Sequence, residues 1–423
     1  MHMPEGLSVL YFYESQMTES ISCLPAAAAD TVSLMFITDK SRAVNVGKAW
    51  DFEEQKEGVY MSDRNIDAYR YTGDKEFDIK HFMTDDTGGM NDRDEAVDEF
   101  VHNLLKINKL QQKLYAECKE GVIFVFQAMD AAGKDGVIRT VFNTLSPHGV
   151  KEYCFKVPSS EESKHEYLWR FWKALPERGR ISIFNRSYYE DVLVGRVHEL
   201  WKKQVRPDRL QDHDIIEDRY KQIKDYENYL YNTGTRIVKI FLNVSKDEQA
   251  RRFISRIDEP RKNWKISAND IKERDYWDAY MDAFEAMVNK TSTSDSPWYV
   301  VPADHKWFAR LLVSRIVLKT LEDINPQWPT VADEEMESVQ EFRQKLSDEL
   351  EGDTAAPEKA APEFANPGIV AAQIVEHEER AKIQAKHERR KEAGFAALNE
   401  LLKNKPVISG KQEIVDAIAD AVD

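Results

Sequence analysis

The sequence predicts an α/β fold in which a parallel sheet is covered by helices on both faces. Short apolar segments rich in β-branched and aromatic residues alternate with longer amphipathic segments, a pattern typical of β–α–β units. The clearest short segment, residues 122–127 (VIFVFQ), follows Gly121 and predicts a buried parallel strand. Four further strands are predicted at residues 152–157, 181–184, 237–244 and 298–301.

The longer segments have helical periodicity. Over residues 94–120, apolar side chains recur on one broad face, from Val97 and Phe100 to Leu114. Because helices separate the predicted strands, each connection can cross over the sheet and return the chain in parallel. The other predicted helices are residues 134–146, 162–177, 187–203, 211–232, 246–257, 268–290 and 306–322.

The predicted domain spans residues 61–328. Residues 1–60 show no sustained period, so we expect an N-terminal extension outside the core; the alternative is a strand or two that dock on the domain. Residues 329–423 predict a charged helical tail, either a solvated appendage or an element for oligomerisation or partner docking. Within this tail we expect a helix at 334–350, a Pro/Ala linker at 355–368 and a helix-prone charged segment at 376–400.

Composition restricts the function. The 423 residues have a formal net charge of −16, which opposes nucleic-acid binding through a general basic surface. A polyanionic ligand would therefore require a local basic pocket. No apolar run approaches the roughly 18 residues of a membrane helix, and a signal-peptide pattern is absent. Three scattered cysteines argue against a disulfide framework or a zinc site. We expect a cytoplasmic protein without nucleic-acid or membrane partners.

A glycine- and lysine-containing loop follows the first strand at residues 128–136 (AMDAAGKDG). A strand, a tight loop and an immediate helix suit phosphate, because the helix N-terminus offers unpaired N–H groups and positive potential. Lys134 supplies a mobile charge for the phosphates, and glycine allows close approach of the backbone. The predicted phosphate-binding residues beside Lys134 are Ala132, Gly133, Asp135 and Gly136.

The loop departs from the GxxxxGK[ST] pattern at two positions. Ala128 replaces the first glycine, and Asp135 stands where a Ser or Thr would contact magnesium. Asp130 lies inside the loop, and a carboxylate beside phosphates is unfavourable unless a cation separates them. Asp130 is therefore the predicted Mg²⁺ ligand, with Mn²⁺ as a possible substitute; the alternative is an Asx turn.

A second strand end, at residues 180–191, runs into a polar turn. Because ligands bind at the carboxyl ends of strands in open α/β sheets, Asn185 and Arg186 should lie beside the phosphate loop. Arg186 is placed to neutralise a transferring phosphoryl group, as an arginine finger does. The alternative for Arg186 is a structural salt bridge.

A basic segment follows the fourth predicted strand. Residues 251–265 contain six basic and two acidic side chains, and Pro260 interrupts their helix. This pattern favours a mobile lid near residues 251–275 that clamps phosphates, over the alternative of a solvated helix face. It would also supply the local basic pocket that an acidic chain needs for a polyanion.

Several ordered segments together resemble the polyphosphate kinase 2 family, over about residues 70–325. They include AMDAAGKDG (128–136), FNRSYYEDVLVGRVH (184–198) and the stretches at 256–287 and 291–316. The resemblance implies a three-layer P-loop kinase fold, similar to thymidylate kinase, with a helical lid. It also implies reversible, Mg²⁺-dependent phosphoryl transfer from inorganic polyphosphate to a nucleotide, and assembly as a dimer or tetramer.

The resemblance assigns roles to individual residues. Asp130 and Lys134 match the family's Walker A acid and lysine, and Arg186 matches its Walker B arginine. The matching lid cations are Arg256, Lys262 and Lys265, and the NRSYYED segment implies nucleotide contacts by Asn185, Tyr189 and Glu190.

The same segment indicates the branch that accepts both AMP and ADP. Many family members have Asp where this chain has Asn185, which puts metal contact there in doubt. An ATP-dependent nucleoside monophosphate kinase and a catalytically silent P-loop protein remain the alternatives.

Overall fold

The computed structural model describes residues 66–90, 93–204, 207–211, 213–266 and 268–350. Within these ranges, six strands form one sheet in the order β1-β6-β5-β2-β4-β3. The strands from β2 to β6 pair in parallel, and the two-residue β1 pairs antiparallel with β6. The strands are β1 (Arg70–Tyr71), β2 (Gly121–Ala128), β3 (Val150–Cys154), β4 (Ile181–Asn185), β5 (Thr235–Asn243) and β6 (Trp298–Pro302).

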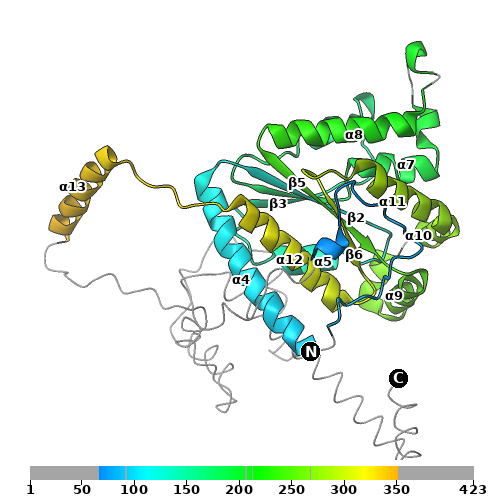
Figure 1. The fold of residues 1–423 in the computed structure, drawn as a ribbon, viewed down its shortest axis with the longest axis horizontal. Helices are drawn as coiled ribbons and strands as arrows, with labels where there is room; N and C mark the ends of the chain where they lie inside the picture. The colour runs from blue at the N-terminus through cyan, green and yellow to red at the C-terminus, as the bar shows by residue number, and fades with distance from the viewer. Residues whose placement is uncertain (1–65, 91–92, 205–206, 212, 267, 351–423) are drawn as a thin grey trace, which may run out of the picture. The chain divides into compact units, whose positions relative to one another are not determined.

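Helices cover the sheet on two sides and make three layers (Figure 1). On one side, α12 packs along α4 and against α5; on the other, α11 packs against α8 and α7. The helices are α4 (Arg93–Glu117), α5 (Lys134–Phe142), α6 (Trp169–Trp172), α7 (Val194–Val197), α8 (Ile215–Asn232), α9 (Lys246–Asp258), α10 (Ala268–Glu273), α11 (Trp277–Thr291), α12 (Lys306–Ile324) and α13 (Asp333–Glu349). The predicted α/β class with a mainly parallel sheet is confirmed.

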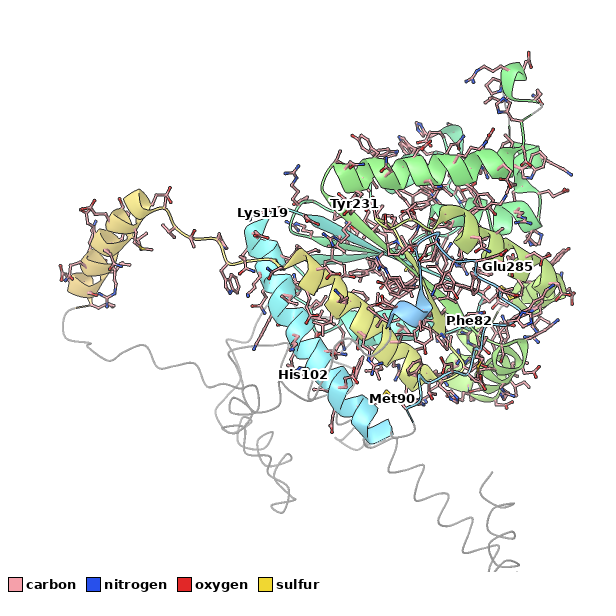
Figure 2. All side chains as sticks on the ribbon, in the orientation of Figure 1. Phe82, Met90, His102, Lys119, Tyr231 and Glu285 are labelled. Atoms are coloured by element: carbon pink, nitrogen blue, oxygen red, sulfur yellow. The ribbon has the colours of Figure 1, made fainter. Side chains whose placement is uncertain are left out.

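The core lies between the sheet and these helices, where side chains fill the space in Figure 2. Every residue of β4 and β6 is buried, as expected for strands of a parallel sheet that helices cover on both faces. The segment before α4 is held on α11, where the Glu285 carboxylate, labelled in Figure 2, accepts a hydrogen bond from the amide of Ile79 at 2.9 Å.

Two predicted helices are broken in the structure. Residues 162–177 form only a 3-10 turn and the short α6, and a side chain binds a backbone amide near the start of each. The Glu162 carboxylate accepts from the Ser159 amide, and that of Glu166 from the Leu168 amide, both at 2.7 Å. Residues 187–203 form three short helices, η4 (Tyr188–Asp191), α7 and η5 (Leu200–Lys203), and Glu199 adopts a left-handed φ of 50° before η5.

The predicted helix at 268–290 is interrupted rather than continuous. It comprises α10, the 3-10 turn η8 (Arg274–Tyr276) and α11. The remaining predicted helices are present with small shifts of their ends, and the helix expected at 334–350 is present as α13. The antiparallel β1 was not predicted, because two residues carry no periodicity.

Other expectations fall outside the described residues. These are the extension at 1–60, the linker at 355–368 and the charged segment at 376–400. Among the residues that the structure does describe, no helix has the length and apolar character needed to cross a bilayer.

The sheet order brings three strand ends together. β2 pairs with β4 on one side and β5 on the other, with Phe126 opposite Asn185 and Ala128 opposite Leu242. The chain first moves from β2 toward β3 and β4 and later returns to β5, so the order reverses at β2. Ligands of open α/β sheets bind at such a switch point.

Candidate active site

The loop after β2 has two residues in the left-handed region. Ala131 has φ 64° and Gly133 has φ 109°, and Gly133 is the N-cap of α5. The non-glycine Ala131 is costly in this region and must be held by its surroundings. Because α5 starts directly at Lys134, its unpaired N–H groups lie next to the loop and can bind an anion.

Lys134 turns back onto the loop. Its Nζ donates to the carbonyl of Ala128 at 2.9 Å, and the residue is only 8% exposed. Burial lowers the pKa of Lys134, and the negative charge of Asp130 partly opposes this effect. A buried ammonium with one carbonyl partner is poised to gain from a phosphate placed beside it.

Asp130 and Arg186 form an ion pair. The Arg186 Nη2 lies 2.8 Å from Asp130 Oδ1, and both side chains remain more than one third exposed. The Arg186 amide donates to the Phe126 carbonyl at 3.1 Å, which fixes the turn after β4 beside β2. Although burial opposes its charge, the carboxylates of Glu190 and Asp130 raise the pKa of Arg186. The two predicted catalytic residues therefore meet at the switch point.

Glu190 interacts with the charges of Arg186, Lys134 and Asp130. Its Oε1 accepts a hydrogen bond from Gln127 Nε2 at 3.1 Å. Burial raises the pKa of Glu190, while Arg186 and Lys134 act in the opposite direction. Gln127, which is fully buried at the end of β2, thus supports a carboxylate that interacts with the two predicted catalytic cations, Arg186 and Lys134.

Asn185 connects two acidic side chains. Its Nδ2 donates to Asp135 Oδ1 and to Glu152 Oε1, both at 3.0 Å. An aspartate in its place would add a third carboxylate to this group and would lose both hydrogen bonds. The amide therefore ties α5 and β3 to the end of β4.

Tyr189 does not reach the site. It is 0% exposed, and its hydroxyl donates to Glu227 Oε1 at 2.8 Å and contacts Thr291 Oγ1 at 3.1 Å. Glu227 also pairs with the buried Lys239 at 2.7 Å. In this structure a nucleotide has no Tyr189 surface to contact, and the residue instead anchors the turn after β4 in the core.

A cavity of about 420 Å³ opens on the other side of the phosphate loop, between α5, α9 and α12. Its floor includes the predicted phosphate-binding residues Ala132, Gly133 and Gly136. Seven lining residues are basic and one, Glu248, is acidic; the basic ones are Arg139, Arg251, Arg252, Arg256, Lys262, Lys306 and Arg310. This is the local basic pocket that a polyanion requires.

The cations crowd one another. Burial lowers the pKa of Lys306 first, and the nearby charges of Arg252, Lys262 and Arg310 lower it further, while the Glu248 carboxylate acts in the opposite direction. One carboxylate offsets only part of the repulsion among seven cations, and a bound anion would relieve the rest. The cavity is therefore electrostatically prepared for a strongly negative ligand.

Two of the three predicted lid cations line this cavity. They are Arg256, on α9, and Lys262, in the 3-10 helix η7 (Pro260–Lys265). Lys262 also pairs with Glu259 at 2.5 Å. The third, Lys265, has its side chain outside the described part of the chain.

Sequence reasoning missed the contribution of α5 and α12. Arg139, Lys306 and Arg310 come from helices that lie far apart in the sequence from the basic segment. Lys306 and Arg310 are four residues apart at the start of the helix after β6, so they share one face. This spacing of two basic residues directly after a strand end is the sequence signal that could have predicted their place in the cavity.

The acidic side chains fit a divalent metal ion. Mg²⁺ prefers hard oxygen ligands and is usually held by one or two carboxylates together with substrate phosphates and water. The one-third exposed carboxylate of Asp130 is such a donor, beside the loop where phosphates would lie. Within the described ranges, no group of three His, Cys, Asp or Glu side chains is arranged to hold a metal ion.

The fold and this site define a P-loop phosphotransferase. A model described as "Polyphosphate kinase 2 (PPK2)" matches residues 90–329, and the chain belongs to this family.

Similar proteins span most of the domain. The ADP-polyphosphate phosphotransferase of Rhodopseudomonas palustris is 48% identical over 263 residues, covering 59% of this chain and 88% of that protein. The AMP/ADP-polyphosphate phosphotransferase of Meiothermus ruber is 43% identical over 262 residues, covering 62% and 94%. The crystal structure of polyphosphate kinase 2 from Arthrobacter aurescens superposes with a TM-score of 0.59 at 38% identity, covering 65% of this chain and 95% of that chain.

Proposed function

We propose that this chain transfers the terminal phosphoryl group of inorganic polyphosphate to AMP and to ADP, forming ADP and ATP. The reaction is reversible and uses a divalent metal ion, Mg²⁺ by preference and Mn²⁺ as a substitute. Family membership and the names of the two relatives support polyphosphate as donor and a nucleotide as acceptor. Acceptance of AMP as well as ADP rests on the likeness to the Meiothermus ruber protein.

The observation that carries the choice of donor is the lining of the cavity beside the phosphate loop. An ATP donor brings an adenine base, which binds through apolar and aromatic surface. Among the described residues that line the cavity none is aromatic, and the apolar ones are four alanines and Val137. Polyphosphate is a row of negative charges without a base, so seven cations suit it better than they suit ATP.

The reaction places little covalent demand on the protein. An oxygen of the acceptor's terminal phosphate attacks the end phosphorus of polyphosphate, and the bridging P–O bond breaks to leave a chain one unit shorter. Lys134 and the amides at the start of α5 hold the donor's terminal phosphates, and Arg186 neutralises charge on the transferring group. Asp130 orients Arg186 through the ion pair described above.

The acceptor phosphate is itself the nucleophile, so no strong general base is required. Positioning and charge neutralisation therefore supply the catalysis. A metal ion bound by Asp130 and the substrate phosphates would add charge stabilisation. Glu190, facing Arg186 and Lys134, is proposed to lie on the acceptor side.

The alternative, an ATP-dependent nucleoside monophosphate kinase, uses the same loop, lysine and arginine. It differs only in the donor, and the basic cavity weighs against it. We further propose a cytoplasmic homo-oligomer, dimer or tetramer, that has neither nucleic-acid nor membrane partners; light scattering after size-exclusion chromatography measures its assembly state.

The acceptor half of the proposal is tested by supplying long-chain polyphosphate and Mg²⁺ with AMP alone. We expect ADP to form first and ATP to follow from it, because both acceptors end in a phosphate that can attack. A preparation that phosphorylates ADP but leaves AMP unchanged would restrict the acceptor to nucleoside diphosphates.

A further inference from the structure

The helix that enters the predicted lid also holds the phosphate loop. On α9, Gln249 is 1% exposed, and its Nε2 donates to the carbonyl of Asp130 at 2.8 Å. Arg252, one turn further along the same helix, donates to the carbonyls of Ala131 and Ala132. Three successive carbonyls of the loop are thus bound by α9, and the strained φ at Ala131 is held in place.

The two side chains differ in what else they contact. The remaining donors of Arg252 bind Glu248 on its own helix and the carbonyls of Ala303 and Asp304 after β6. All of these partners belong to α9 or to the sheet edge. Arg252 therefore links the loop to α9 and to the segment after β6.

Gln249 instead reaches the far end of the lid. Its Oε1 accepts a hydrogen bond from Arg274 Nη1, and Arg274 also donates to the carbonyl of Lys246 at 3.2 Å. Arg274 follows α10, where the lid segment rejoins the body. The neighbouring Glu273 is held there by the hydroxyl of Tyr280 at 2.7 Å and by His198 at 2.8 Å.

A continuous series of polar contacts therefore runs from the lid end to the catalytic arginine. Arg274 binds Gln249, and Gln249 binds the main chain of Asp130. Asp130 in turn binds Arg186. Because Gln249 is buried, moving Arg274 away would leave its acceptor unpaired, which is unfavourable.

We propose that Gln249 is a positioning residue that couples the lid to the phosphate loop. With the lid end seated, Arg274 fixes the orientation of the Gln249 amide, and the amide fixes Asp130 against Arg186. The inference rests on the proposed function only in that both concern the same phosphoryl-transfer site.

A double-mutant cycle on kcat tests this coupling. The variants are Gln249→Leu, Arg274→Met and the two combined, measured at saturating donor and acceptor, with thermal unfolding recorded for each. Each single change should lower kcat about tenfold, the effect of one lost buried hydrogen bond. If the two side chains act through one contact, the combined variant should also lose about tenfold rather than about a hundredfold.

Two further variants sharpen the result. Gln249→Glu is nearly isosteric and keeps the acceptor for Arg274, but it replaces the donor to the Asp130 carbonyl with a second acceptor. It should lower kcat as Gln249→Leu does, and because a buried acceptor then faces the Asp130 carbonyl, it should also lower the melting temperature. Asp247→Asn, an exposed change two residues earlier on α9, is the matched control and should leave kcat unchanged.

Multiplicative losses in the combined variant would overturn the coupling. Single variants that lower the melting temperature but keep the kcat of the wild type would also overturn the coupling, because a purely structural role predicts that pattern. The cycle uses whichever donor the wild-type chain accepts. Failure of polyphosphate as donor would therefore count against the proposed function and leave the test of Gln249 intact.

Discussion

The guanidinium of Arg186 lies 2.8 Å from the carboxylate of Asp130 and joins the end of β4 to the loop after β2. Both residues follow adjacent parallel strands, and the amide of Arg186 is bonded to the Phe126 carbonyl of β2. The pair therefore keeps its arrangement before substrate binds. Such preorganised charge is the largest single contribution to many enzymes' rate enhancement.

Arg186→Lys should lower kcat by about 10²- to 10³-fold, because lysine keeps the charge but loses the planar fork. Steady-state kinetics with saturating polyphosphate and ADP measures the effect. Arg180→Lys, at the opposite end of β4 and paired with Glu177, is the matched control and should keep the wild-type rate. A wild-type kcat in Arg186→Lys would contradict the proposed catalytic role of Arg186.

Lys134→Ala should abolish turnover while the fold survives, and Asp130→Asn should do the same. Lys134 is buried with a lowered pKa, so its charge is unfavourable in the folded state without substrate. We therefore expect no loss of thermal stability in Lys134→Ala. Melting followed by circular dichroism measures thermal stability, and product formation measures turnover. Full activity in either variant would contradict the assignment of that residue to the active site.

Arg256→Gln and Lys262→Gln should each raise the KM for polyphosphate several-fold and leave the KM for ADP nearly unchanged. The reason is that both side chains line the basic cavity, where polyphosphate is proposed to bind. The KM for polyphosphate should also rise with salt more steeply than that for ADP. Lys221→Gln, an exposed change on α8, serves as control. An equal rise in the KM for polyphosphate and the KM for ADP would contradict polyphosphate binding in this cavity.

Lys239→Met should destabilise the protein by about 3–5 kcal/mol, because it leaves Glu227 charged and unpaired in the core. Lys239 and Glu227 are 0% and 1% exposed and lie 2.7 Å apart. Chemical denaturation measures the loss. Adding Glu227→Gln should recover much of it, since the amide oxygen still accepts from Tyr188 and Tyr189. A double variant no more stable than Lys239→Met would refute this account of the pair.

Chelation should remove activity without unfolding the chain. Carboxylates and substrate phosphates would hold the metal ion, so EDTA should abolish turnover, Mg²⁺ should restore it, and Mn²⁺ should restore it in part. The melting temperature should change little, because the proposed ligand Asp130 lies partly exposed on the loop and not in the core. Undiminished activity in EDTA would contradict a metal-dependent transfer.

The strands and the phosphate loop could be predicted from the sequence because their signals lie in short, continuous segments. Residues 122–127 form an apolar run that could only be a buried segment, and the loop, Lys134 and helix follow it directly. The meeting of Asp130 with Arg186 followed from strand ends sharing one edge of a parallel sheet. These inferences needed no knowledge of side-chain packing.

The rest depended on tertiary contacts. Tyr189 stands beside Glu190 in the sequence, but the turn after β4 directs it into the core, where Glu227 binds it. The cations at Lys306 and Arg310 reach the cavity only because α12 packs against α5. The break between the 3-10 turn at Glu162–Lys164 and α6 also has no signal in the periodicity of the sequence.

The most direct test of the central claim is a donor comparison. Purified protein is incubated with Mg²⁺ and ADP, with either long-chain polyphosphate or GTP as donor, and with Mg²⁺ and AMP, with either polyphosphate or ATP; nucleotides are resolved by chromatography. Formation of ATP from ADP, and of ADP from AMP, with polyphosphate and no nucleoside triphosphate is the expected result. Phosphorylation of AMP with ATP alone, and none with polyphosphate, would make the chain an ordinary nucleotide kinase and contradict the assignment of the basic cavity.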